Sequence, residues 1–536
     1  MKKKLAQSIA IALGAVMLMT SLTGCAGGSM EAAYDSAYAP TTESYFSESI
    51  AEEPMYDYEY VDYEEPDYNT EEYNAITENR FLSTVTSPFS TFSSDVDTAS
   101  YSNVRRYIDN RDLPPADAVR IEELLNYFTY DYPEPNGDEP FSVTTEISAC
   151  PWNEDTQLLL VGLQAEKLDP ESMPDSNLVF LIDVSGSMDS PDKLPLVKQA
   201  FMLLTEQLGE NDRISIVTYA SSDEVVLDGA TGNDRQAIMD AINYLDAGGS
   251  TAGSAGITTA YEIAEKYFIE GGNNRIILAT DGDLNVGPSS EGALTRLVEK
   301  KRENGVFLSV MGFGTGNIKD NKMEALADNG NGSYHYIDSV SEARRVLIEE
   351  MGGTLFTVAK DVKFQIEFNP AVLKGYRLIG YENRVMADED FSDDTKDAGE
   401  IGAGHRVTVL YELVTVDSAM DIPAPELYYT SASDTGSDDY LTVKVRYKEP
   451  DGDTSKLLTY PVGPEAYTDQ PSNNFVFASA VAQYGMLLRD SDYSGTATYE
   501  SVLEQLDSRE NLLSDEYRVE FYRIVDDTRL IEELYY

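Results

Sequence analysis

The chain has 536 residues, more than one ordinary domain and enough to bury several hydrophobic cores. Its 95 acidic residues against 39 basic ones give a formal net charge of -56 at pH 7. Recognition of nucleic acid or of an anionic lipid surface rests on clustered Lys and Arg. This balance therefore argues against both as main partners and favours cations or basic proteins.

The first 25 residues predict a lipoprotein signal peptide. Three lysines at positions 2–4 precede the apolar stretch 9–19, which is too short for a membrane span. Residues 22–25, Leu-Thr-Gly-Cys, resemble a lipobox, where bacterial lipoproteins are cleaved and acylated; an ordinary signal peptide with an incidental cysteine is the alternative. Several acyl chains on Cys25 would hold the mature protein stably at a membrane. We therefore expect an extracytoplasmic, lipid-anchored protein, at the outer membrane if the source has two membranes.

Residues 26–79 predict a disordered acidic spacer. They contain no Lys or Arg, whereas Asp, Glu and Tyr recur throughout. Charge repulsion and the shortage of aliphatic side chains oppose folding. As a flexible coil the segment would reach on the order of 40 Å, and repulsion would extend it. We interpret it as a stalk that lifts the folded region off the lipid; a binding motif of Tyr and acidic residues is the alternative.

Residues 80–175 predict a segment that contains both helices and strands. Its triplet Asp95-Val96-Asp97 superficially resembles the nucleophile motif of aspartyl phosphotransferases, but no apolar strand precedes it. We therefore interpret residues 94–98 as a loop and helix cap. Pro115 is expected at the start of a second helix, whose apolar face carries Val119, Leu124, Leu125 and Phe128.

Cys150 is the only cysteine besides Cys25. No internal disulfide can therefore form once Cys25 is acylated. We expect Cys150 to be a buried small hydrophobe, with an intermolecular thiol as the alternative.

Short apolar stretches alternate with helix-length stretches across residues 176–352. The predicted strands are 178–182, 214–219, 224–227, 276–279, 306–312 and 333–337, and the predicted helices are 193–208, 234–244, 255–268, 289–304 and 319–329. This alternation predicts an α/β domain with a doubly wound, parallel sheet and helices on both faces.

Five oxygen-bearing side chains follow strands or lie in a Gly-rich loop of this domain: Asp183, Ser185, Ser187, Thr251 and Asp281. Asp183 and Asp281 lie at the carboxyl ends of two predicted central strands, where open α/β sheets hold their ligands. Gly186 removes a Cβ where the loop would curl around an ion. A hard cation such as Mg²⁺ prefers an octahedron of oxygens. The pattern therefore predicts a divalent-cation site.

The segments DVSGSM, GGST and TDG resemble, in this order, the three parts of the metal-ion-dependent adhesion site of von Willebrand factor type A (VWA) domains. The resemblance covers residues 176–352 and implies a Rossmann-like fold. It makes Ser185, Ser187 and Thr251 ligands of Mg²⁺, with Asp183 and Asp281 binding directly or through water; Mn²⁺ and Ca²⁺ are alternative ions. The alternative is a domain whose site has decayed and stays empty.

Segments that read as β-strands lie on both sides of this domain. They are 141–147 and 158–163 before it, and 362–368, 406–414, 441–447 and 457–462 after it. Strict apolar-polar alternation in VKFQIEF and LTVKVRY predicts half-buried antiparallel strands. Because two strands alone make a poor sheet, we propose one β-sandwich with the VWA-like domain inserted. A separate β domain over 353–470 competes with it.

Residues 471–536 predict helices with one apolar face. The two predicted faces carry Phe475, Ala478, Ala482 and Met486, and Tyr517, Phe521, Ile524 and Thr528. Together with residues 80–175, this region resembles the segments that accompany the VWA domain in bacterial lipoproteins of unknown function.

Three functions fit these features. In the first, which we expect, the protein is no enzyme, and a partner protein's acidic side chain fills the open position on the ion. In the second, a hydrolase, the ion would need a general base or a second ion nearby; the two histidines, His335 and His405, are interpreted as structural, and no G-x-S-x-G, P-loop or HExxH motif occurs. In the third, the protein is a cell-envelope scaffold with an incidental or regulatory metal site.

Overall fold

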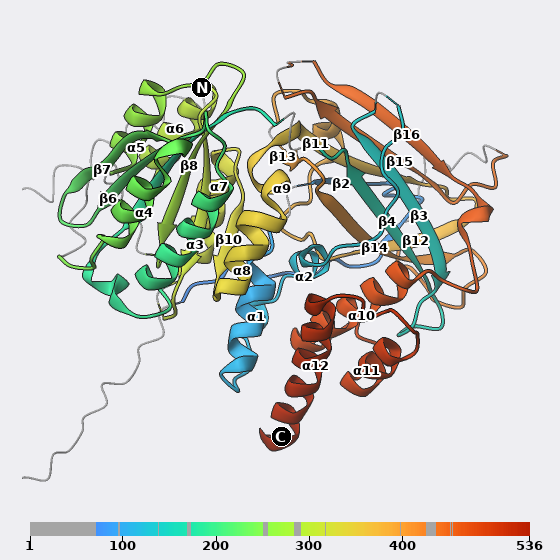
Figure 1. The fold of residues 1–536 in the computed structure, drawn as a ribbon. Coiled ribbons are helices and arrows are strands. Elements are labelled where there is room, and N and C mark those ends of the chain that lie inside the picture. The colour runs from blue at the N-terminus through green and yellow to red at the C-terminus, as the bar shows by residue number, and fades with distance from the viewer. Residues whose placement is uncertain are drawn as a thin grey trace, which may run out of the picture. The chain divides into compact units, whose positions relative to one another are not determined.

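The computed structural model describes residues 71–535, except 95–96, 138, 169–172, 250–255, 283–290, 317, 397, 425–435, 451 and 453. Three β-sheets and their helices make up these residues (Figure 1). None of the described helices combines the length and the apolar content that a membrane span needs. The predicted signal peptide, Cys25 and the acidic spacer up to residue 70 lie outside the described residues. The prediction of a disordered spacer is wrong for residues 71–79, which contact the folded region: the Glu72 N–H donates to the Ile318 carbonyl at 3.0 Å, and the Glu71 carboxylate pairs with Arg106 at 2.9 Å.

The six-stranded sheet of the α/β domain has the order β10-β9-β8-β5-β6-β7. Its strands are β5 (Ser176–Asp183), β6 (Arg213–Tyr219), β7 (Asp223–Thr231), β8 (Asn273–Thr280), β9 (Phe307–Phe313) and β10 (Tyr334–Ile337). All neighbours are parallel except β6 and β7. Every residue of β5 and β8 is buried, as strands covered on both faces require. The doubly wound sheet is therefore confirmed, with one antiparallel edge strand.

Helices cover both faces of this sheet. They are α3 (Leu194–Gln207), α4 (Arg235–Asn243), α5 (Gly256–Lys266), α6 (Glu291–Arg302), α7 (Asp320–Asn329), α8 (Val340–Arg344), a π-helical turn (Arg345–Glu349) and α9 (Met351–Leu355). Phe180 of β5 stacks on Phe201 of α3 with ring centroids 4.1 Å apart. Val179 and Leu181 belong to a separate core with Ile257 of α5. Alternate residues of one strand thus anchor the two helix layers.

Two antiparallel sheets flank the α/β domain. One contains β1 (Leu82–Ser83), β12 (Leu373–Ile379), β14 (Arg406–Thr415), β4 (Gln157–Ala165) and β3 (Phe141–Ala149); the other contains β13 (Gly399–Gly402), β11 (Thr357–Phe368), β15 (Leu441–Lys448) and β16 (Lys456–Val462), with β2 (Phe89–Ser93) on β11. β4 pairs with β14 along residues 157–164 and 406–413. Strands from before and after the α/β domain thus share one sheet, as the single-sandwich interpretation expects. The sheets pack through Phe368, which stacks on Tyr376 at 3.8 Å.

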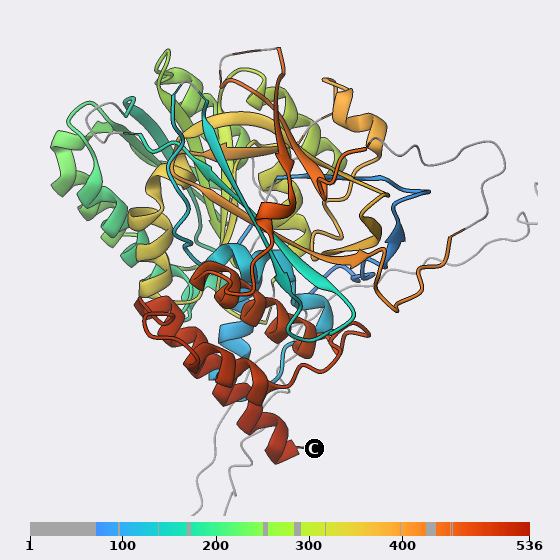
Figure 2. The same ribbon diagram turned by 90° about the vertical axis from the view of Figure 1, so that its right-hand side faces the viewer.

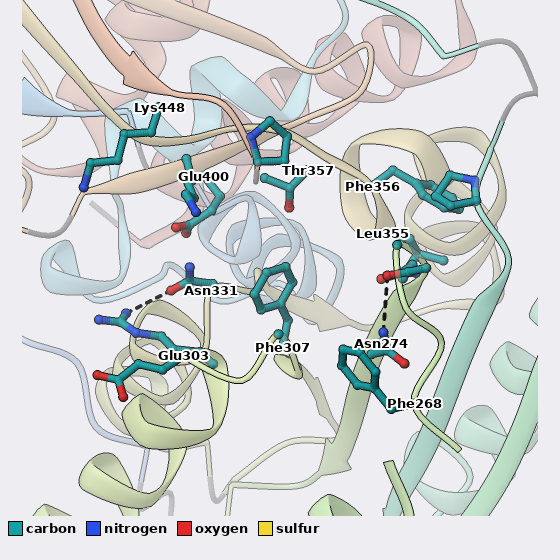
Figure 3. Close-up of a pocket in the computed structure, with 18 of the residues that line it drawn as sticks. Phe268, Asn274, Glu303, Phe307, Asn331, Leu355, Phe356, Thr357, Glu400 and Lys448 are labelled. Atoms are coloured by element: carbon teal, nitrogen blue, oxygen red, sulfur yellow. Dashed lines mark hydrogen bonds between the residues drawn. The ribbon is translucent and has the colours of Figure 1, made fainter. Parts of the chain in front are cut away.

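A cavity of about 750 Å³ lies between the α/β domain and these sheets (Figure 3). Asn274 and Phe307 line it from the amino ends of β8 and β9, and Thr357, Glu400 and Lys448 line it from the antiparallel strands. It therefore lies at the end of the α/β sheet opposite to the predicted metal ligands.

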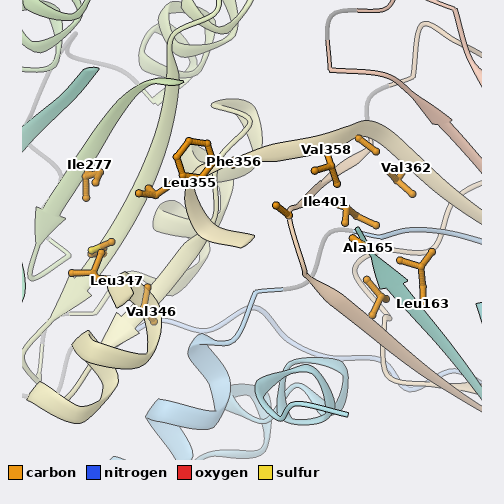
Figure 4. Close-up of a cluster of buried hydrophobic side chains, with 14 of the residues drawn as sticks. Leu163, Ala165, Ile277, Val346, Leu347, Leu355, Phe356, Val358, Val362 and Ile401 are labelled. Atoms are coloured by element: carbon orange, nitrogen blue, oxygen red, sulfur yellow. The ribbon is translucent and has the colours of Figure 1, made fainter. Parts of the chain in front are cut away.

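A continuous hydrophobic core also joins the two regions (Figure 4). It runs from Ile277 of β8 and Leu347 of the π-helical turn, through Phe356, to Val362 of β11 and Leu163 of β4. The α/β domain is therefore packed against the sandwich and is not merely linked to it.

The amino-terminal helices differ from the prediction. α1 covers Ala99–Asp109, and α2 covers Ile121–Tyr127. The second helix was expected to start at Pro115, but only a 3₁₀ turn follows this proline. The Ser100 hydroxyl donates to the carbonyl of Ala118 at 2.7 Å and accepts from the Arg120 N–H at 2.9 Å. These bonds hold residues 119–120 extended, so the α-helix begins one residue later.

Three helices close the chain: α10 (Asn473–Leu488), α11 (Tyr499–Asp507) and α12 (Glu516–Tyr535). Both views show them together below the antiparallel strands (Figures 1 and 2). The prediction of a single apolar face is wrong for α10, because residues 475–486 are all buried. This helix packs against both α2 and α11 and is enclosed by their neighbours.

Cys150 is buried, as predicted, beside Trp152. Its thiol lies 3.8 Å from the Glu412 carboxylate. Burial and the nearby charge of Glu412 together raise the pKa of Cys150 to about 12. A buried thiol that stays protonated is poorly suited to an intermolecular disulfide.

Candidate metal centre

Two of the predicted carboxylates lie at the same edge of the α/β sheet. Asp183 is the last residue of β5, and Asp281 directly follows β8. The strands are parallel neighbours with Ile182 opposite Ala279, so their carboxyl ends coincide. The Thr280 hydroxyl reaches across to the Asp183 carboxylate at 3.5 Å. Both acids are almost fully buried, so the sheet itself brings them together.

The loop after β5 adds two hydroxyls to these carboxylates. The N–H of Ser185 donates to Asp183 Oδ1 at 2.9 Å, which folds the loop back over the strand end. The hydroxyl oxygens of Ser185 and Ser187 are 3.0 Å apart. Ser185 is buried and Ser187 is exposed. Four of the five predicted ligands therefore belong to one strand end and its neighbour.

The Gly-rich loop that carries the fifth ligand is pinned to the same place. The N–H of Gly248 donates to the Val184 carbonyl at 2.8 Å, and the N–H of Gly186 donates to the Gly249 carbonyl at 3.1 Å. A Cβ on Gly186 would lie 3.3 Å from that carbonyl oxygen, so close backbone packing explains this glycine. Thr251 itself lies outside the described residues.

Burial and like charge act together on Asp183. Burial and, to a smaller extent, the nearby Asp281 carboxylate together raise the pKa of Asp183 to about 6, against the opposing effect of the hydrogen bonds from Ser185. A cation at this edge of the sheet would relieve the repulsion between the two carboxylates.

Lys193 is a member of this cluster that sequence reasoning missed. Its ammonium donates to Asp281 Oδ2 at 2.9 Å and to the Ser187 carbonyl at 2.9 Å. It immediately precedes α3, six residues after Ser187. The sequence signal that could have revealed it is a basic residue only six positions after a predicted cation-binding loop.

The donor set fits a hard divalent cation. Two buried carboxylates and two hydroxyls supply the oxygens that Mg²⁺ prefers, and the remaining positions suit water or a ligand. Elsewhere among the described residues, no cluster of three or more His, Cys, Asp or Glu side chains is placed to hold a metal ion.

The residues considered for catalysis have structural partners. His335 is buried on β10, 3.3 Å from the Thr98 hydroxyl and 3.0 Å from the Ser333 hydroxyl, and burial lowers its pKa to about 3. Burial likewise lowers the pKa of His405 to about 4. Asp97 accepts from the Tyr334 N–H at 2.8 Å. Asp95 lies outside the described residues.

Comparison with known proteins agrees with the fold. The von Willebrand factor type A domain family matches residues 177–349, a family described as von Willebrand factor matches 67–160, and a family described as Uncharacterized protein YfbK, C-terminal, matches 353–531. The fold and these matches define a VWA-domain protein, a class whose domain suggests protein–protein interaction or adhesion and is not typically enzymatic. More particularly, the chain belongs to the family of the Uncharacterized protein YfbK of Escherichia coli K12. It is 43% identical to that protein over 453 residues, which cover 82% of this chain and 78% of the relative.

Two lower-identity matches are a curated protein and a solved structure. The Uncharacterized protein sll0103 of Synechocystis is 30% identical over 185 residues, which cover 34% of this chain and 43% of that protein. The solved structure described as von Willebrand factor type A from Catenulispora acidiphila has a TM-score of 0.39 and 17% identity, and the match covers 71% of this chain and 88% of that one.

Proposed function

We propose that this protein is a membrane-anchored, extracytoplasmic VWA protein that binds a partner protein through Mg²⁺. The ion would be held by Asp183, Ser185, Ser187, Thr251 and Asp281. The observation that carries the proposal is the meeting of two buried carboxylates and two hydroxyls at one edge of the sheet. An octahedral ion held there keeps a position that an acidic side chain of the partner fills.

Capture of partners from native membranes tests this proposal. Partners bound by the purified protein in Mg²⁺ should be lost in chelator and lost with Asp183→Ala, because each change removes the ion that bridges the two proteins. Asp240→Ala is the matched control, since Asp240 is exposed on α4 and its carboxylate accepts a hydrogen bond from the neighbouring Gln236. The same partners in Mg²⁺ and in chelator would contradict ion-dependent binding.

One observation favours a second function, an envelope scaffold whose metal site is incidental or regulatory. Lys193 already forms an ion pair with Asp281, so this chain partly neutralises its own acidic centre. A scaffold would keep its partners in chelator, and the capture experiment therefore separates the two functions.

The anchoring part of the proposal rests on Cys25. Cys25→Ser should abolish incorporation of radiolabelled palmitate and leave either unlipidated precursor or released protein, because no other side chain at the processing site can take the thioether-linked lipid. Cys150→Ser is the matched control and should keep the label, since Cys150 is buried in the folded region. Palmitate entering the Cys25→Ser protein would overturn the anchoring proposal.

A further inference from the structure

Lys193 joins the two loops that carry the candidate ligands. Its ammonium lies 2.9 Å from Asp281 Oδ2, after β8, and 2.9 Å from the Ser187 carbonyl, after β5. The side chain of Lys193 is 11% exposed and that of Asp281 is fully buried. This contact is therefore an internal ion pair within the candidate metal centre, in which surface screening plays little part.

The neighbouring strand leaves room for this lysine. Gly314 follows β9 and has a φ of +75°, and a Cβ there would lie 2.3 Å from both Cγ and Cε of Lys193. The Tyr336 hydroxyl donates to the Gly314 carbonyl at 2.7 Å and holds this segment in place. The aliphatic part of Lys193 thus occupies a built channel that directs the ammonium to Asp281.

The position of the ammonium affects any divalent ion that shares Asp281. Asp183, Asp281 and Lys193 together carry a net charge of about -1, whereas the carboxylates alone would carry about -2 at neutral pH. Two cations that share one buried carboxylate repel each other strongly, because the low-dielectric interior weakens the interaction little. The lysine therefore stabilises the ion-free centre and opposes binding of a divalent ion.

Building on the proposed function, we propose that Lys193 is a built-in competitor of the divalent cation. It holds Asp281 and the Ser187 loop in place when no ion is bound, and it lowers the affinity of the centre for Mg²⁺. The centre then holds Mg²⁺ most tightly when a partner supplies a further carboxylate. In this way the lysine couples ion binding to partner binding.

Titration of the full-length protein with Mg²⁺ alone, followed by calorimetry, tests this proposal. Lys193→Met, which keeps the aliphatic chain and removes the charge, should bind Mg²⁺ roughly tenfold more tightly than the wild type. In chelator the same variant should melt at a lower temperature than the wild type, because Asp281 loses its counter-ion. Lys193→Arg keeps the charge and should bind no more tightly than the wild type. Lys193→Gln provides a second neutral side chain if the Met variant is poorly folded.

The outcomes separate this inference from the proposed function. If the wild type binds Mg²⁺ and both neutral variants bind it no more tightly, Lys193 is a purely structural residue and only the inference fails. If neither the wild type nor the folded neutral variants bind Mg²⁺, the proposed function fails as well. If only the neutral variants bind, Lys193 competes as proposed and the wild-type centre does not function with the ion alone.

Discussion

Asp183→Ala is expected to abolish Mg²⁺ binding by this protein. The change removes one of two carboxylates from a centre whose other predicted ligands are hydroxyls, and hydroxyls alone do not offset the cost of dehydrating Mg²⁺. Ser185→Ala should weaken binding less than Asp183→Ala does, because water can replace one neutral oxygen ligand. Calorimetric titration of the three proteins measures both effects.

Thermal unfolding gives an independent measure of the same loss. An ion that binds only the folded protein stabilises it by about 2.7 kcal/mol at 100 times its dissociation constant. Excess Mg²⁺ should therefore raise the melting temperature of the wild type and leave that of Asp183→Ala unchanged. Asp183→Asn is the matched control, because its side-chain oxygen still accepts the Ser185 N–H while the charge is removed. Equal Mg²⁺ binding by wild type and Asp183→Ala would place the ion elsewhere, and the adhesion-type function would lose its main support.

Most residues of the candidate centre could be predicted from the sequence because the ligands follow strands. A short apolar run ending in Asp183, and a second one followed by Asp281, are enough to place both acids at one edge of a parallel sheet. Lys193 gave no comparable pattern. Its role depends on the space over Gly314, which arises only when β9 packs beside β8.

β12, which the sequence analysis did not predict, lacks a clear period. β12 contains Lys374, Gly375 and Arg377 among its apolar residues, so no alternation is visible. Gly375 is needed because a Cβ there would lie 2.7 Å from Ile422 and 3.0 Å from the Leu82 carbonyl, both distant in sequence. α10 was predicted as a helix, but its sequence did not show that it is buried on all sides and therefore has no polar face. These features are set by tertiary packing and not by local sequence.

The second large effect is expected when the chain is divided at the end of the VWA domain. A fragment from Ser176 to Gly352 should fold alone, because it contains all six strands of its sheet and both helix layers. A fragment from Thr354 to Tyr536 should not unfold cooperatively. It lacks β3 and β4, so β14 loses its partner along residues 406–413 and its apolar residues face water.

Restoring the missing strands is the decisive control for this division. Residues 71–168, joined to residues 354–536 by a flexible Gly/Ser linker in place of the VWA domain, should regain a cooperative urea transition because β4 again pairs with β14. This protein should remain less stable than the full chain, since Arg105 loses its buried ion pairs with Asp338 and Glu342, at 2.6 and 2.9 Å. Circular dichroism followed through urea unfolding distinguishes the fragments. A cooperative transition in the Thr354–Tyr536 fragment by itself would mean that the strands after the VWA domain form a separate domain, and that β3 and β4 are an addition to it.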